Sequence, residues 1–284
     1  MQINPVIEKE LKTKMRGWKA PALITAYLGF LFLVVIFYFL ILYDDGYYGM
    51  RNIISEVAVS LYNTLAFLQL LLILFITPII TGGAISSERE RQTLDLLLCT
   101  DFSAFKIVIG KIFVSIAHVM LLVIASFPIL GIVFLYGGVG ITDILLLFVF
   151  YILVAVMTAS VGVFYSTIFK KTIISIVLTY ITLGVFILGT LISFLIITEV
   201  IMDYYFTAEW YHFMLFFAPN PFYGFGTVLE NTATGYGLFY GFVSLANSDG
   251  GVPIIKALGV NSIFNIVLSY SLIKLSAKRI RRLK

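Results

Sequence analysis

The sequence has 284 residues, of which 61% are hydrophobic and 12% are charged, and its mean hydropathy is +1.04. Soluble domains are about 45–50% apolar and about 25% charged, so this composition excludes an ordinary soluble protein. The net charge of +4 is better explained by an uneven distribution of basic residues across a membrane than by nucleic-acid binding, and we expect no nucleic-acid partner.

The N-terminal segment, residues 1–19, has the pattern of an amphipathic helix. Asn4 is a candidate N-cap, and Pro5 suits the first helical position. After them, apolar side chains recur every three or four residues between charged ones. Such a helix would lie in the plane of a membrane surface with its lysines toward the lipid headgroups. The alternative is an unstructured basic tail.

Five uncharged runs follow, each longer than about 20 residues, the length that a helix needs to cross the hydrocarbon core of a bilayer. A sixth run, residues 257–273, is shorter, but Lys256 and Lys274 at its ends can extend to the two interfaces. We therefore predict an all-α integral membrane protein with six transmembrane helices in a single transmembrane domain, residues 1–284. The predicted helices are residues 20–43, 57–81, 106–136, 143–168, 172–198 and 254–275.

The basic residues set the predicted orientation, because Lys and Arg near the ends of membrane spans are retained in the cytoplasm. With the N-terminus inside, every Lys and Arg except Arg51 and Lys256 falls on the cytoplasmic side. We therefore expect a multi-pass protein of the plasma membrane with both termini in the cytoplasm. The first apolar run follows a charged stretch and is too long for a signal peptide, so we expect it to remain as an anchor.

A charged segment, residues 84–103, connects the second and third spans on the cytoplasmic side. Ser87 is followed three residues later by Glu90, which is the pattern of a capping box at the start of a helix. Glu88 is placed to pair with Arg91 one turn later. These features predict a short cytoplasmic helix.

The same helix, residues 88–99, would carry an apolar stripe, because Leu94, Leu97 and Leu98 recur at helical spacing. Asp101 and Ser103 can then cap the third span. The stripe must be buried, and two alternatives stay open. It packs either on the inner surface of the protein and its headgroups, or on a soluble partner.

The region before the last span, residues 199–253, is long and rich in aromatic residues. Its apolar stretches are interrupted by Pro219 and Pro221, and none of them is a complete span. Irregular backbone at membrane depth must be buried in protein or line a cavity, so we expect a re-entrant pair of half-helices or an interfacial lid on the extracellular side. The alternative is an aromatic belt at the outer surface.

The sequence contains no recognisable catalytic or metal-binding motif. His118 lies inside the third span, where it is either functional or hydrogen-bonded to a neighbouring helix, and His212 belongs with the outer aromatic region. No phosphate-binding loop is present, and the lone Cys99 does not form a metal site. We therefore expect no catalytic, cofactor-binding or metal site. The polar residues expected to hold helices together are Asn63, Gln69, Ser160, Asn261 and Asn265.

The stretch "SSERERQTLDLLLCTDFS", residues 86–103, resembles the segment between the second and third spans of ABC-2 class permeases, the membrane subunits of ATP-driven exporters. The family pattern is loosely E-x-E-x-G-T-L-E/D-L-L-L, and here Gln92 stands at the usual Gly and Asp101 at a usual Pro. The stretch "NPVIEKELKTKMRG", residues 4–17, resembles the connector helix that leads into the first span of this family. The six spans and the long apolar region before the last one also fit it.

The resemblance implies the membrane subunit of an ABC exporter, which forms the translocation path and is not itself an enzyme. It implies that the cytoplasmic helix couples to a separate P-loop ATPase, which binds ATP and Mg, so that this chain holds no cofactor. Two permeases, identical or homologous, would pair with two ATPases within the lipid membrane. The implied coupling residues are Glu88, Arg89, Glu90, Arg91, Thr93, Leu94, Asp95, Leu97 and Leu98. The implied connector-helix residues are Ile7, Leu11, Lys12, Met15 and Arg16.

Two other classes of protein are compatible with the same composition. One is a polytopic membrane enzyme that acts on lipids, with His118 or the outer aromatic region as its site. The absence of paired catalytic groups argues against it. The other is a membrane scaffold or immunity protein that binds a partner without transport, and only coupling to ATP turnover distinguishes it from an exporter subunit.

Overall fold

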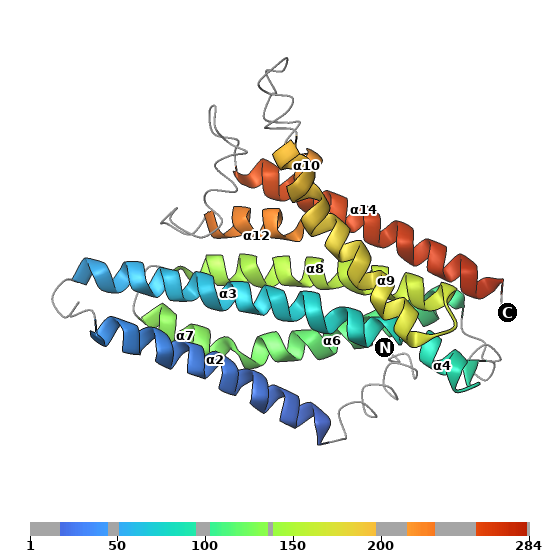
Figure 1. The fold of residues 1–284 in the computed structure, drawn as a ribbon, viewed down its shortest axis with the longest axis horizontal. Helices are drawn as coiled ribbons and strands as arrows, with labels where there is room; N and C mark the ends of the chain where they lie inside the picture. The colour runs from blue at the N-terminus through green and yellow to red at the C-terminus, as the bar shows by residue number, and fades with distance from the viewer. Residues whose placement is uncertain are drawn as a thin grey trace, which may run out of the picture.

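The computed structural model describes residues 18–44, 51–94, 103–135, 139–196, 215–230 and 254–282, and every regular element in these ranges is a helix (Figure 1). The elements are α2 (Lys19–Asp44), α3 (Arg51–Gly82), α4 (Ser86–Glu90), α6 (Ala104–Ala125), α7 (Phe127–Leu135), α8 (Ile141–Ile168), α9 (Thr172–Gly184), the π-helix η1 (Val185–Gly189), α10 (Thr190–Ile196), α12 (Pro221–Glu230) and α14 (Ile254–Arg281). The all-α class is confirmed, and the predicted connector helix, residues 1–19, lies almost entirely outside the described residues.

Within the described ranges, five helical segments are long and apolar enough to cross a membrane, which makes this a polytopic membrane protein. They are Val57–Glu90, Ala104–Gly131, Ile141–Ile168, Thr172–Ser193 and Leu258–Arg281. The predicted first span is also helical, as α2, but its described apolar part, Ile24–Leu40, is shorter than the others.

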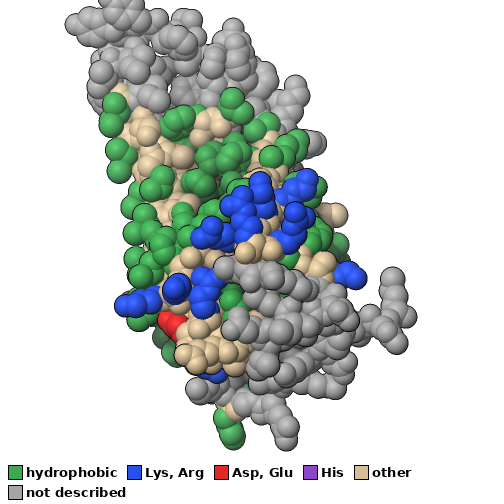
Figure 2. All heavy atoms as spheres, turned by 90° about the vertical axis from the view of Figure 1, so that its right-hand side faces the viewer, with side chains coloured by type: hydrophobic (Ala, Val, Ile, Leu, Met, Phe, Trp, Pro, Cys, Tyr) green, Lys and Arg blue, Asp and Glu red, His purple; other side chains and the backbone are tan. Residues whose placement is uncertain are grey.

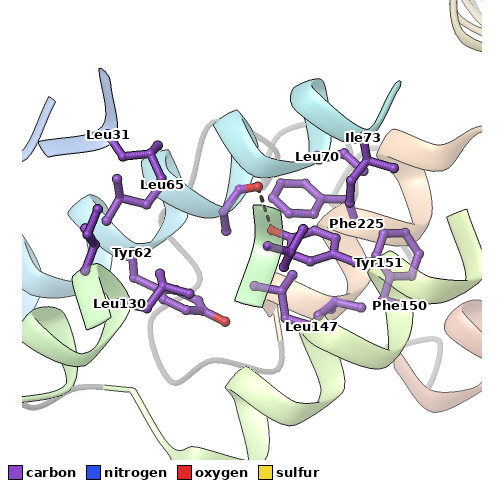
Figure 3. Packing of buried hydrophobic residues seen from close by; sticks show 14 of the residues in the cluster. Leu31, Tyr62, Leu65, Leu70, Ile73, Leu130, Leu147, Phe150, Tyr151 and Phe225 are labelled. Carbon is purple, nitrogen blue, oxygen red and sulfur yellow. Dashed lines mark hydrogen bonds between the residues drawn. The ribbon is translucent and has the colours of Figure 1, made fainter. Parts of the chain in front are cut away.

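Helix α8 is the centre of the bundle and contacts α3, α6, α9, α12 and α14 (Figure 1). Its side chains Leu147, Phe150 and Tyr151 are buried in the main hydrophobic core, which also takes residues from α2, α3, α7 and α12. Figure 3 shows that Tyr151 projects toward α3, where its hydroxyl donates a hydrogen bond of 2.7 Å to the carbonyl of Ala66. An apolar helix that is buried on most sides needs such a partner for its polar atoms.

Helices α3, α8 and α9 approach one another closely near the end of α3. A Cβ atom added to Gly162 on α8 would lie 2.0 Å from the Oγ1 atom of Thr81 on α3. A Cβ atom added to Gly82 would lie 2.6 Å from the Cγ1 atom of Ile176 on α9. Small residues allow membrane helices to pack at short distance, so the start of α4 is held at a tight junction of three helices.

The predicted third span, residues 106–136, is interrupted at Ser126. Helix α6 is capped at its start by Ser103, as predicted, because the hydroxyl of Ser103 accepts a hydrogen bond from Lys106 N at 3.4 Å. Helix α6 ends at Ala125 because Pro128, in the first turn of α7, has no N–H to continue the hydrogen-bond ladder. Gln69 on α3 donates a hydrogen bond of 2.8 Å to the Ser126 hydroxyl, as expected of a residue that holds helices together.

The described part of the region before the last span contains α12, which is 10 residues long and therefore too short to cross a membrane. Pro221 occupies its first position, and the Oδ1 atom of Asn220 caps it by accepting a hydrogen bond from Phe222 N at 2.8 Å. Tyr223 and Phe225 are buried against the bundle. This burial favours the predicted half-helix over a surface belt, while residues 197–214 and 231–253 lie outside the described residues.

Asn261 on α14 connects the last span to the residues directly before α12. Asn261 donates hydrogen bonds to the carbonyls of Ala218, at 2.8 Å, and Asn220, at 3.1 Å. Asn265 donates one of 3.0 Å to the Oδ1 atom of Asn261. Asn261 therefore holds helical segments together, as predicted, whereas the hydrogen bond that Asn265 donates stays within α14.

Candidate functional site

The candidate site is the segment Ser86–Leu94, which we call the α4 turn. It follows α3 after only three residues and lies at the end of the bundle where α9 begins (Figure 1). Helix α4 ends at Glu90, and residues 91–93 are not helical. The prediction of one helix over residues 88–99 is therefore wrong in its described part.

The turn at Arg91–Thr93 is a helix-ending motif built around Gln92, which has a positive φ of 59°. Gln92 N donates to the carbonyl of Arg89 at 3.2 Å, and Thr93 N donates to the carbonyl of Glu88 at 2.9 Å. This pair of hydrogen bonds defines a Schellman motif, in which the left-handed position favours glycine. Gln92 stands at the position where the ABC-2 class pattern has Gly. In this chain a non-glycine residue adopts the left-handed conformation of the turn.

The predicted capping box is wrong. The hydroxyl of Ser87 donates to the carbonyl of Gly83 within its own helical turn, and the carboxylate of Glu90 does not return to the start of α4. Instead, the hydroxyl of Ser166 on α8 accepts hydrogen bonds of 2.8 Å from both Ile85 N and Ser86 N. Two N–H groups at the start of α4 are thus satisfied by a neighbouring helix, while Ser87 N donates to the carbonyl of Gly83.

The carboxylate of Glu90 caps the start of α9. Its Oε1 atom accepts a hydrogen bond of 2.8 Å from Thr172 N, and its Oε2 atom accepts one of 2.8 Å from the Thr172 hydroxyl. Thr172 is the first residue of α9, where the backbone N–H groups have no partner within the helix. A negative charge at this position also interacts favourably with the helix dipole.

Arg89 contacts the opposite helix end. Its Nη2 atom donates a hydrogen bond of 3.3 Å to the carbonyl of Thr167, in the last turn of α8. The carbonyl groups of a last turn lack partners within the helix and favour a positive charge. Adjacent residues of α4 with opposite charges therefore bind the two ends of the turn between α8 and α9, residues 169–171.

An ion pair with α6 also attaches the α4 turn to the bundle. The Nζ atom of Lys111 lies 2.5 Å from the Oε1 atom of Glu88, and the two side chains are 6% and 24% exposed. The predicted pairing of Glu88 with Arg91 is therefore wrong, because Glu88 turns toward the bundle and Arg91 is exposed. A carboxylate and an ammonium group that are removed from water stabilise each other only as a pair.

Leu94 is buried, at 8% exposure, in a small hydrophobic cluster at this end of the bundle. The cluster includes Ile85, Val108 on α6, Val163 on α8 and Ile280 on α14. Of the two alternatives for the leucine stripe, Leu94 therefore follows the first, because it packs on the protein's own inner surface. Asp95, Leu97 and Leu98 lie outside the described residues, as do the connector residues Ile7, Leu11, Lys12, Met15 and Arg16.

The outward side of the α4 turn is exposed from Glu90 to Thr93. Figure 2 shows this end of the molecule, where basic side chains gather with little acidic surface between them. The exposed basic residues at this end are Arg91, Lys106, Lys170, Lys171, Lys274, Lys278, Arg279, Arg281 and Arg282.

The partners of the α4 turn were not predicted from the sequence. Lys111, Ser166, Thr167 and Thr172 hold it in place, although none of them belongs to the charged segment. Two signals were available, since Lys111 is a single charge inside a long apolar run and Thr172 directly follows the basic turn between two spans. His118 is half-buried on α6, and in the described ranges no group of His, Cys, Asp and Glu side chains is arranged to hold a metal ion.

The fold and this site define a multi-pass membrane protein with a structured turn at one end of its helix bundle. A family model described as "ABC-2 family transporter protein" matches residues 46–270. The match covers most of the chain and includes the α4 turn, so the protein belongs to the ABC-2 transporter family as a membrane component. Such permeases lack the ATPase domain themselves and generally pair with ATPase subunits. No curated protein matches the chain.

Proposed function

We propose that this protein is the transmembrane subunit of an ABC exporter and that the α4 turn is its contact with a separate P-loop ATPase. The single observation that carries the proposal is the geometry of Glu90, whose carboxylate binds the start of α9 while the residues that follow it are exposed. The α4 turn therefore joins an accessible surface to the spanning helices.

The contacts of the α4 turn with the spanning helices explain how a displacement of this turn would move those helices. Glu90 and Arg89 bind the turn between α9 and α8, and Glu88 binds Lys111 on α6. Leu94 packs in a hydrophobic cluster with residues of α6, α8 and α14. Because packed helices move as rigid bodies, a displacement of α4 shifts α8 and α9 together rather than bending the turn alone.

The ATPase would bind ATP and Mg. This chain would form part of the translocation path and would transmit the movement of the ATPase through the α4 turn. A second permease, identical or homologous, would complete the path. The protein would lie in the plasma membrane, with the α4 turn and the basic C-terminal end of α14 on the cytoplasmic side. This orientation agrees with the retention of Lys and Arg in the cytoplasm. The predicted connector helix would lie at the same surface.

The test is to purify the tagged protein from its own cells in mild detergent and identify stoichiometric partners by mass spectrometry. We expect a P-loop ATPase at about one copy per permease. Arg91→Glu should reduce its recovery, because Arg91 is exposed and has a solvent-facing charge. Lys106→Glu, which changes an exposed charge of the same sign on α6, serves as the control.

Glu90→Gln separates an exporter subunit from a passive scaffold. It weakens the bonds to Thr172 but leaves the exposed turn in place. In a reconstituted complex we expect normal ATPase binding with an altered rate of ATP turnover. Unchanged turnover in both Glu90→Gln and Arg91→Glu, or recovery of the protein without any ATPase, would contradict the proposal and favour a scaffold.

A further inference from the structure

Helix α14 has two different faces along its 28 residues. Its buried face carries Asn261, Asn265, Ser269, Ser276 and Ile280. The opposite face is apolar and open, with Ile263 at 63%, Val267 at 61% and Tyr270 at 53% exposure. In a membrane protein such an apolar face is directed toward lipid.

Three basic residues continue the open face beyond its apolar part. With 3.6 residues per turn, Lys274, Lys278 and Arg281 follow Val267 and Tyr270 along the same side of the helix. All three are exposed. We call Lys274, Lys278 and Arg281 the α14 basic stripe. Because of this register, the stripe is directed toward the surrounding lipid rather than toward the α4 turn.

The aromatic residue at the start of the stripe marks the depth at which the charges begin. The Nζ atom of Lys274 lies 4.4 Å from the centre of the Tyr270 ring, which is a cation–π contact. Exposed tyrosines of membrane helices gather at the level of the headgroups. At about 1.5 Å per residue the stripe extends roughly 10 Å further along the helix, which is comparable to the polar layer of one leaflet.

The charges of the stripe are not neutralised within the described part of the chain. No described carboxylate pairs with Lys274, Lys278 or Arg281. The two carboxylates of the α4 turn have other partners, since Glu88 binds Lys111 and Glu90 binds Thr172. Figure 2 shows the resulting basic surface at this end.

We propose that the α14 basic stripe binds the phosphate headgroup of an anionic phospholipid, with the acyl chains along Ile263 and Val267. The bilayer is the source of the ligand because the stripe continues a lipid-facing surface, which a soluble protein does not reach. Basic residues near a membrane surface attract anionic lipids. This inference does not depend on coupling to an ATPase.

The experiment titrates the detergent-purified full chain with phosphatidylglycerol or phosphatidylcholine and counts bound lipids by native mass spectrometry. We expect tighter binding of phosphatidylglycerol. The variant K274Q/K278Q/R281Q should bind it about a hundredfold more weakly, since each basic residue contributes roughly fivefold. The matched pair is Lys278→Gln and Arg279→Gln, adjacent residues of which only Lys278 lies on the stripe.

A second measurement needs no variant. The melting temperature of the wild-type protein in vesicles that contain phosphatidylglycerol should exceed that in phosphatidylcholine vesicles. Equal binding of the two lipids, equal losses in Lys278→Gln and Arg279→Gln, or an unchanged melting temperature would each overturn the proposal. Loss of a copurifying ATPase from the triple variant without loss of lipid would also overturn it and assign the stripe to a protein partner.

Discussion

The carboxylate of Glu90 accepts hydrogen bonds from both the backbone N–H and the hydroxyl of Thr172, 82 positions further along the chain. This relationship makes a residue of the short helix α4 the N-terminal cap of the spanning helix α9. Arg89, its neighbour, binds the last turn of α8 at the carbonyl of Thr167. The connection between two spans is thus held from outside by one dipeptide whose charges match the two helix ends.

The first prediction concerns the coupling of Glu90 and Thr172. Glu90→Ala and Thr172→Val should each lower the melting temperature of the purified protein, because each removes hydrogen bonds at the start of α9. The double variant should lose less than the sum of the two single losses, since both changes disrupt the same contact. Differential scanning fluorimetry in detergent measures all four proteins, and additive losses would show that the contact does not form.

The second prediction concerns Gln92, which adopts a φ of 59°. A left-handed conformation costs an L-residue roughly 1–2 kcal/mol, and Gly avoids this steric cost. Gly also loses more backbone entropy on folding, which offsets part of the gain. Gln92→Gly should therefore raise the free energy of unfolding by about 0.5–1 kcal/mol. Chemical denaturation in detergent measures the change.

Two further substitutions at the same position control for side-chain loss. Gln92→Ala removes most of the side chain but keeps the Cβ atom, and it should give no gain. Gln92→Val should destabilise the protein, because a β-branched residue tolerates the left-handed region poorly. A gain in Gln92→Ala equal to that in Gln92→Gly would mean that the backbone of this turn is not strained.

The sequence predicts the spanning helices well because their signal is local. Long uncharged runs in a bilayer favour helices, and the structure is helical in the described parts of all six predicted ranges. Ser103 was also predicted correctly as the cap of α6, since its partner is three residues away. Interruptions within spans, such as the break at Ser126, depend on single residues and were missed.

The α4 turn was predicted less well because its partners are distant in the sequence. Ser87 and Glu90 have the spacing of a capping box, yet the carboxylate of Glu90 binds Thr172 on α9, and Ser166 on α8 binds backbone N–H groups at the start of α4. Glu88 likewise pairs with Lys111 rather than with Arg91. Local patterns identified the right segment, but tertiary contacts replaced its expected local hydrogen bonds.

The third prediction concerns the ion pair between Lys111 and Glu88. Lys111→Met should destabilise the protein by about 2–4 kcal/mol, because it leaves a partly buried carboxylate without its cation. Combining it with Glu88→Gln should recover part of this loss, since the remaining side chain is then neutral. Denaturation curves of the single and double variants measure the recovery, and a double variant less stable than Lys111→Met would contradict the pairing.

The fourth prediction tests the junction from which α4 emerges. Gly162→Ala should destabilise the protein by about 1–3 kcal/mol, because its new methyl group would overlap the side chain of Thr81 and force α3 away from α8. The control is Gly29→Ala on α2, where nothing lies within 4 Å of an added Cβ atom. There the substitution should be neutral or stabilising by about 0.5–1 kcal/mol, as expected for Ala in place of Gly inside a helix.

Comparing these two alanine variants separates packing from helix propensity. Both replace a helical glycine, so propensity alone predicts that both gain stability. Only the close approach of Thr81 makes Gly162→Ala unfavourable. A loss at Gly162 that Thr81→Gly relieves would establish the contact, whereas equal gains at both positions would mean that α3 and α8 are further apart in the membrane. In that case α4 would not be fixed to α8 at this junction. A displacement of α4 would then not move α8 and α9 together, which contradicts the proposed coupling.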